Sequence, residues 1–146
     1  MPRPDATAEL TTALEERILM LDGAMGTTIR GYGLTEEDAR GERFKDIDKD
    51  ILNNGDILTL TRPDVISDIH RRFLEAGSDI VETNSFSATS IAQSEFFVED
   101  PRESGKGRKD PEFYQKIMDD PFLKDLAHEL NVESAKLARA ACDEVT

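Results

Sequence analysis

Cysteine is nearly absent from this sequence of 146 residues, since Cys142 is its only one. A single thiol excludes a disulfide within the chain, and this usage is typical of the reducing cytosol, so we expect a cytoplasmic location. Histidine is also scarce, with two residues that lie far from Cys142 in the sequence. We therefore interpret Cys142 as a small packing residue rather than a zinc ligand or a nucleophile.

Long apolar runs are missing as well. None approaches the ~20 residues that span a membrane, and no apolar secretory segment follows Met1. Basic residues are few, with 18 Lys and Arg against 31 Asp and Glu, which leaves a net charge of −13. Because such a charge repels phosphate backbones, we expect no nucleic-acid partner. The lack of a spanning run predicts no membrane partner. The remaining composition, 38% hydrophobic and 34% charged, is typical of one globular domain with a real core.

The most informative stretch begins with a short apolar run at residues 18–21. A continuous apolar run is typical of a strand buried on both faces, and this one stops at Asp22 and Gly23. Gly23 and Gly26 let a ligand approach the backbone, and Asp22 supplies a charge or a hydrogen-bond acceptor. The same residues also fit a tight turn in which Asp22 caps nearby amides, so both interpretations stay open at this point.

A clear amphipathic helix is predicted between residues 61 and 77. Pro63 lies in its first turn, where a missing N–H costs nothing, and Gly77 closes it. We interpret His70 as a surface or interface residue, because its neighbours in the sequence are charged. The apolar stripe of this helix consists of Val65, Ile66, Ile69, Phe73 and Leu74.

A second strand is predicted directly after this helix. Residues 80 and 81 are β-branched, and the polar residues Glu82, Thr83 and Asn84 follow them. Strand, helix and strand in this order predict parallel strands joined by a right-handed crossover. Asp22 would then emerge at the same sheet edge as residues 82–84, and this convergence favours a binding site over a simple turn.

The rest of the chain predicts further helices and loops but no third strand. Two parallel strands cannot form a self-sufficient sheet, because both faces and both edges need cover. The predicted fold class is therefore α/β, the first βα units of a (β/α)₈ barrel that is incomplete in this chain. Helices are expected at residues 8–17, 88–97, 112–118 and 125–145, and loops at 29–56, with a helical turn at 35–40, and at 100–111.

Two motifs in combination resemble a known family. Asp-Gly-x-x-Gly-Thr lies at residues 22–27, and Glu-Thr-Asn-x-Phe lies at residues 82–86. Together with four further stretches they make the chain similar to the amino-terminal homocysteine-binding module of cobalamin-dependent methionine synthase, within the homocysteine S-methyltransferase family. Arg-Gly-Glu-Arg-Phe favours this synthase over betaine- or S-methylmethionine-dependent relatives, which stay as an alternative. The matching stretches are residues 16–27, 40–44, 53–56, 62–66, 75–86 and 135–139.

The resemblance implies a barrel that binds homocysteine and zinc. Zinc lowers the pKa of the thiol, the thiolate takes the methyl group of methylcobalamin to give methionine, and methyltetrahydrofolate restores that methyl group. The partners implied are homocysteine, the remaining half of the barrel, and the folate and cobalamin modules of the same enzyme. A carboxylate at Asp22 and backbone N–H groups near Gly23 would suit the amino-acid end of homocysteine. The substrate-binding residues implied are Asp22, Gly23, Met25, Gly26, Glu82, Thr83 and Asn84.

The chain departs from this family in two ways. Zinc is held there by three cysteine thiolates from later strands, which are not present, and Cys142 aligns with none of them. We therefore expect no catalytic residue, no metal ligand, no bound zinc or cobalamin, and no activity of this fragment alone. Residues 98–124 are longer than in the family and predict a loop insertion within a domain that spans residues 1–146.

Two other functions stay open. A truncated or split product of the same family would serve only as a non-catalytic interaction module. An unrelated α/β protein that binds phosphate at residues 22–26 ranks last, because Asp22 would repel the phosphate. The spacing of Gly23 and Gly26 also falls short of a dinucleotide fingerprint.

Overall fold

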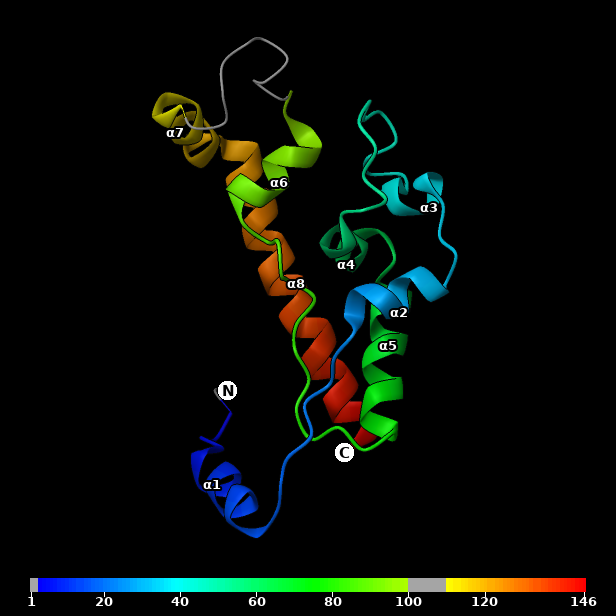
Figure 1. Ribbon diagram of the computed structural model, residues 1–146, viewed down its shortest axis with the longest axis vertical. Coiled ribbons are helices and arrows are strands. Elements are labelled where there is room, and N and C mark those ends of the chain that lie inside the picture. Colours follow the sequence, from blue (N-terminus) through cyan, green and yellow to red (C-terminus); the bar gives the residue numbers. More distant parts are fainter. Residues whose placement is uncertain (1–2, 100–109) are drawn as a thin grey trace.

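The structure, a computed structural model, describes residues 3–99 and 110–146 (Figure 1). Helices and connecting segments make up this part of the chain, and no sheet occurs within it. The helices are α1 (Thr7–Glu16), α2 (Met25–Gly31), α3 (Glu36–Arg40), the 3₁₀ turn η1 (Gly55–Ile57), α4 (Leu58–Thr61), α5 (Pro63–Glu75), α6 (Ser90–Phe97), α7 (Pro111–Asp119) and α8 (Pro121–Val145).

The long helix α8 organises the arrangement, with α5 packed beside its carboxyl-terminal half and α6 beside its amino-terminal half (Figure 1). Its start is encoded locally, because the Asp120 side chain accepts a hydrogen bond from the backbone N–H of Leu123, 2.9 Å away, and Pro121 fits the first turn. The predicted start of this helix, residue 125, is therefore four residues too late.

The core lies where α5 meets α8. Apolar residues of both helices are fully buried there, and each contributes about 1.5–3 kcal/mol relative to an exposed position. The short elements α3 and α4 add further members, so one cluster joins the middle of the chain to its last helix. Its buried residues are Ile29, Ala39, Phe44, Ile51, Ile57, Leu58, Val65, Ile66, Ile69, Ala88, Leu126 and Leu130.

The prediction of an α/β fold, with the first βα units of a (β/α)₈ barrel, is wrong for this structure. The two expected strands run side by side, but they form one isolated parallel bridge, between Leu21 and Ile80. The backbone N–H of Asp22 donates to the Ile80 carbonyl at 2.9 Å. Ile18, expected on a buried face, is 85% exposed. Two strands without neighbours leave both edges and both faces uncovered, so the ladder does not extend beyond this bridge.

The predicted helices are confirmed with small shifts at their ends. The expected segments 8–17, 35–40, 61–77, 88–97 and 112–118 correspond to α1, α3, α5, α6 and α7. Helices α2 and α4 were not predicted, because each is too short to show an apolar period. The predicted insertion at residues 98–124 falls partly outside the described residues, and its later part forms α7 and the start of α8.

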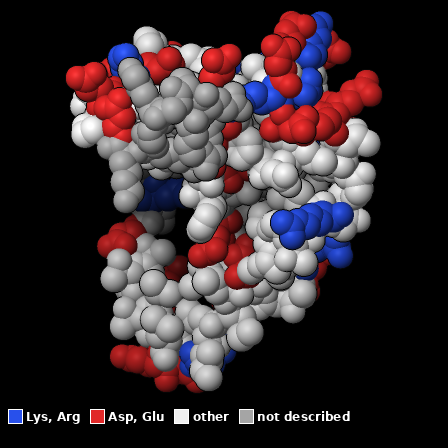
Figure 2. All heavy atoms as spheres, turned by 45° about the horizontal axis from the view of Figure 1, so that its top comes forward, with Lys and Arg blue, Asp and Glu red and all other residues white. Residues whose placement is uncertain are grey.

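Acidic side chains gather along the upper part of the face shown in Figure 2, in keeping with the net charge of −13.

Helix α1 stands apart from the other helices (Figure 1) and contains no buried residue. Ion pairs of Arg3 with Asp143 and of Arg17 with Asp79 connect this part of the chain to the rest.

Candidate functional site

All seven predicted site residues line one hollow. Two segments form it, residues 22–26 and residues 82–86, and it encloses about 210 Å³. The single bridge between Leu21 and Ile80 sets these segments side by side just before the polar residues begin. A Cβ added at Gly23 or Gly26 would meet no atom within 4 Å, so space for a ligand lies directly against this backbone. We name this space the first hollow.

Asp22 joins the two segments of the first hollow. Its Oδ1 accepts a hydrogen bond from the backbone N–H of Glu82 at 2.9 Å, and its side chain is almost fully buried. Its other oxygen, Oδ2, lies 3.9 Å from Nδ1 of His70. The carboxylate therefore has a structural role, which joins two distant segments rather than capping the amides of a local turn, and it also lines the hollow.

His70 lies in the interior, so its prediction as a surface residue is wrong. The residue is 0% exposed, and neither ring nitrogen has a hydrogen-bond partner. Burial lowers the pKa of His70, and the negative charge of Asp22 opposes this shift. The signal for burial was present in the sequence, because position 70 follows Ile66 by four residues and so shares its apolar face.

We expect His70→Leu to stabilise the protein by about 1–2 kcal/mol at neutral pH, because it removes two buried polar atoms without partners. The unfolded chain binds a proton below pH ~6.5, whereas the folded chain, with its lowered pKa, resists it. The free energy of unfolding of the unaltered protein therefore falls as the pH drops below this value. The variant has no imidazole at position 70, so it should not show this fall. Urea unfolding at pH 7.5 and pH 5.5 measures both effects.

The matched control for this measurement is His128→Leu on the exposed side of α8, which should change the free energy of unfolding at pH 7.5 by less than about 0.5 kcal/mol. A loss of stability in His70→Leu, with the pH dependence unchanged, would show that the ring nitrogens of His70 make a favourable interaction in the folded state.

Hydrogen bonds from the Asn84 side chain connect residues 82–86, the second segment of the first hollow, to the residues in and after η1. Nδ2 of Asn84 donates to the Gly55 carbonyl at 2.9 Å and to Oγ1 of Thr59 at 3.1 Å. The side chain is buried, so these bonds compensate for the water that it loses. Asn84 lines the first hollow and also a neighbouring one.

This second hollow is larger, with a volume of about 400 Å³. It shares Met25, Gly26, Asn84 and Phe86 with the first hollow, so the two adjoin. Its other walls include Arg30 of α2, the loop before η1, and Asp56 of η1 itself. Neither Arg30 nor Asp56 was predicted to have a role, although residues 53–56 belong to the stretches that carry the family resemblance.

Residues 19–146 match the sequence family described as homocysteine S-methyltransferase. The chain belongs to this family. It is a methyltransferase family, and the match includes both segments of the first hollow and all of the second. Membership shows a role in homocysteine methylation in general, while the contact of each lining residue with a substrate stays a prediction.

A buried amide pair supports the second hollow in this homocysteine S-methyltransferase family member. Nδ2 of Asn54 donates to Oε1 of Gln93 at 2.7 Å, and Nε2 of Gln93 donates to the Ser87 carbonyl at 3.0 Å. The backbone N–H of Ser87 in turn donates to Oδ2 of Asp56 at 2.6 Å. This network holds the loop before η1 against the segment that leads to α6.

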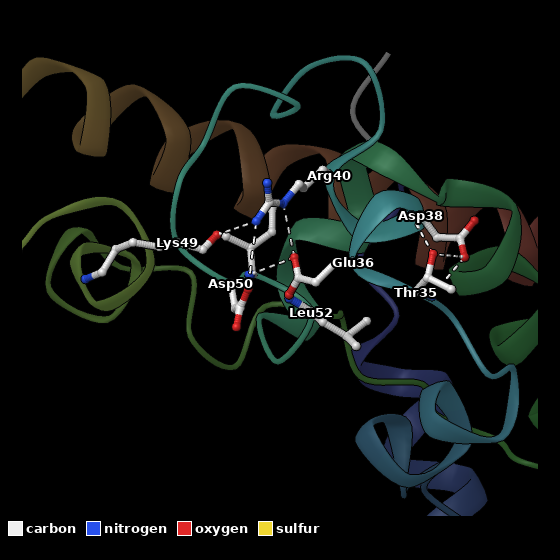
Figure 3. Close-up of polar contacts among 8 residues, drawn as sticks. Thr35, Glu36, Asp38, Arg40, Lys49, Asp50 and Leu52 are labelled. Atoms are coloured by element: carbon white, nitrogen blue, oxygen red, sulfur yellow. Dashed lines mark hydrogen bonds and ion pairs between the residues drawn. The ribbon is translucent and has the colours of Figure 1, made fainter.

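Glu36 fixes the outer part of the same loop (Figure 3). Its carboxylate accepts hydrogen bonds from the backbone N–H groups of Ile51, at 3.1 Å, and Leu52, at 2.6 Å. Arg40 donates to Glu36 at 3.2 Å and to the Lys49 carbonyl at 3.1 Å. Partial burial raises the pKa of Glu36, but these donors outweigh burial and lower it overall. Leu52 is thereby held as a wall of the second hollow.

The zinc implied by the family resemblance does not fit the residues in hand. Within residues 3–99 and 110–146, no group of three or more His, Cys, Asp or Glu side chains could hold a metal ion. Cys142 is a free cysteine, half-buried on α8. The same described ranges contain no helix long and apolar enough to cross a membrane.

Proposed function

We propose that this chain is the amino-terminal portion of cobalamin-dependent methionine synthase and that its two adjoining hollows receive homocysteine. The sulfur of homocysteine would accept a methyl group there to give methionine. The residues proposed to line the substrate site are those of the first hollow, with Asp22, Glu82 and Asn84 as its polar side chains.

One observation carries this proposal. The two motifs of the family resemblance lie about sixty residues apart in the sequence, yet residues 22–26 and 82–86 line a single hollow. The match over residues 19–146 includes both segments. A small concave site with a few converging polar groups is the usual form of a substrate pocket.

The identity of the methyl donor rests on the Arg-Gly-Glu-Arg-Phe stretch at residues 40–44. In this proposal the donor is methylcobalamin, regenerated from methyltetrahydrofolate on separate modules of the enzyme. Betaine and S-methylmethionine are the competing donors. Because the described residues hold no metal-binding group, we expect the 146 residues alone to bind neither zinc nor cobalamin and to form no methionine.

The test compares the complete gene product with the isolated 146-residue chain. Calorimetry with homocysteine measures binding, and methionine formation is followed with methylcobalamin, betaine and S-methylmethionine in parallel. We expect binding and methylcobalamin-dependent methionine formation by the complete gene product, and neither by the isolated chain. Turnover with betaine or S-methylmethionine would reassign the donor, and absence of homocysteine binding to the complete gene product would refute the proposal.

A non-catalytic interaction module is the second candidate, and exposed apolar side chains favour it. Phe86 is 99% exposed, and Ile18, Met20 and Leu21 are exposed along the first extended segment. A complete gene product that binds no homocysteine but forms a stable complex with another protein through these residues would support this second function.

A further inference from the structure

The ring nitrogens of His70 are the unexplained polar atoms of the interior. His70 is 0% exposed, and in the described part of the chain it is the only residue with buried side-chain nitrogen or oxygen atoms that lack a hydrogen-bond partner. Proteins pair nearly all such atoms, and each exception needs an explanation. A leucine at this position is expected to be more stable, so packing alone does not account for the histidine. Residues that break the rules of stability in this way are found mainly at functional sites.

The ring lies beside a residue of the first hollow. Nδ1 of His70 is 3.9 Å from Oδ2 of Asp22, and the side chain of Asp22 is 4% exposed. This distance is too long for a hydrogen bond, but hydrogen bonds in active sites are often long in the free protein and shorten when a ligand binds. Oδ1 of Asp22 already accepts the Glu82 N–H at 2.9 Å. A second bond, at Oδ2, would fix the plane of the carboxylate, which one bond leaves free to turn.

An uncharged imidazole is suited to this position. Burial lowers the pKa of His70, and the negative charge of Asp22 opposes this shift, so the ring is neutral at pH 7 and above. A neutral ring with its proton on Nδ1 donates one hydrogen bond and leaves the negative charge of Asp22 intact. A lysine or an arginine there would compete with a ligand for that charge. Asp22 therefore keeps its charge for a cation in the first hollow, where open space lies against Gly23 and Gly26.

We propose that His70 is a positioning residue for the amino-acid end of the substrate. When homocysteine binds in the first hollow, Nδ1–H of His70 closes on Oδ2 of Asp22 and fixes the carboxylate that receives the ammonium group. Because His70 is 0% exposed, it acts through Asp22 and not by contact with the ligand. This inference rests on the proposed function, which supplies homocysteine as the ligand, and it adds a residue that had no role there.

Three substitutions at position 70 test the proposal in the complete gene product, with homocysteine binding measured by calorimetry. Nδ2 of an asparagine is bonded to Cγ, as Nδ1 of histidine is, so His70→Asn keeps a donor near Asp22. His70→Gln places its donor one bond further along the side chain, and His70→Leu has none. We expect His70→Leu and His70→Gln to weaken homocysteine about three- to tenfold, the effect of one lost hydrogen bond, and His70→Asn to weaken it by less than about twofold.

Thermal unfolding of the same variants without ligand separates positioning from a structural role. His70→Leu should unfold at a higher temperature than the unaltered protein, although it binds homocysteine more weakly. His70→Asn should unfold at a lower temperature, because its smaller side chain leaves a cavity, although it keeps its affinity. If the role of His70 were merely structural, affinity would follow stability in the same order.

A second ligand gives an independent arm, which decides the question if His70→Asn does not fold. 4-Mercaptobutyrate lacks the ammonium group, so His70→Leu should change its affinity by less than about twofold. His128→Leu, on the exposed side of α8, is the matched control and should leave homocysteine binding unchanged.

Three results would overturn the proposal: unchanged homocysteine affinity in His70→Leu, equal losses for the two ligands, or a loss in folded His70→Asn as large as that in His70→Leu. Each of these leaves the proposed function intact, because the unaltered protein still binds homocysteine. If the unaltered protein binds no homocysteine, the proposed function itself fails and this inference fails with it.

Discussion

Leu130→Ala should lower the free energy of unfolding by about 2–5 kcal/mol, the usual cost of a large-to-small change in a core. Leu130 is fully buried on α8 and belongs to the same cluster as Ile66 and Ile69 of α5. Alanine removes apolar atoms from this contact and leaves a cavity that two rigid helices cannot close. Urea unfolding followed by circular dichroism measures the change.

The matched control for Leu130→Ala is Leu14→Ala. Leu14 is also a helical leucine, but it lies on α1 with 58% of its surface exposed, so its loss should change stability by less than about 0.5 kcal/mol. Equal effects of the two substitutions would contradict a core centred on α5 and α8.

Asn84→Asp should destabilise the protein by about 3 kcal/mol at pH 7, although the two side chains have nearly the same shape. The substitution removes the donor to the Gly55 carbonyl and places a carboxylate oxygen against it in a buried position. Burial and the facing carbonyl should raise the pKa of the new carboxyl group in the folded state. The variant therefore regains stability as the pH falls, because the folded protein then binds the proton more readily than the unfolded chain.

Asn53→Asp provides the control, since Asn53 is exposed in the loop that precedes η1. Thermal unfolding of both variants at pH 7 and pH 4.5, each compared with the unaltered chain, separates the two cases. A loss in Asn84→Asp that is no smaller at pH 4.5 would show that the Asn84 amide is not a buried donor.

Local signals were sufficient for the longer helices. α5 follows from Pro63 in its first turn, Gly77 after its end and an apolar stripe between them, and all of these are encoded within about fifteen residues. The start of α8 is also encoded locally, because the Asp120 side chain caps this helix. The predicted start at residue 125 was wrong because it did not take this cap into account. Capping and helical period act over a few residues, so they can be read without knowledge of the fold.

The candidate site was located by an argument that was only partly right. Parallel strands were expected to bring Asp22 close to residues 82–84, and the structure brings them together without a sheet. One bridge between Leu21 and Ile80 is sufficient for this, because it aligns the two segments immediately before their polar residues. The role of these side chains as substrate contacts stays a prediction.

The residues that were missed depend on distant neighbours. His70 has charged neighbours in the sequence, yet it is buried beside Asp22, forty-eight positions earlier. Asp56 was also missed, because its carboxyl group is buried against the segment around Ser87, thirty-one positions later in the sequence. The burial of His70 and Asp56 cannot be predicted from a local pattern, because it arises from segments that come together only on folding.

The sequence by itself determined the longer helices, the apolar face of α5 and the two motifs of the homocysteine S-methyltransferase family, because each is encoded in residues that are near one another in the chain. Only the tertiary structure decided that residues 18–21 and 80–81 form a single bridge instead of a sheet, that His70 is buried, and that Asp56 and Arg30 line one cavity. Each of these outcomes depends on which surfaces cover a segment, and that cover is supplied by residues far away in the sequence.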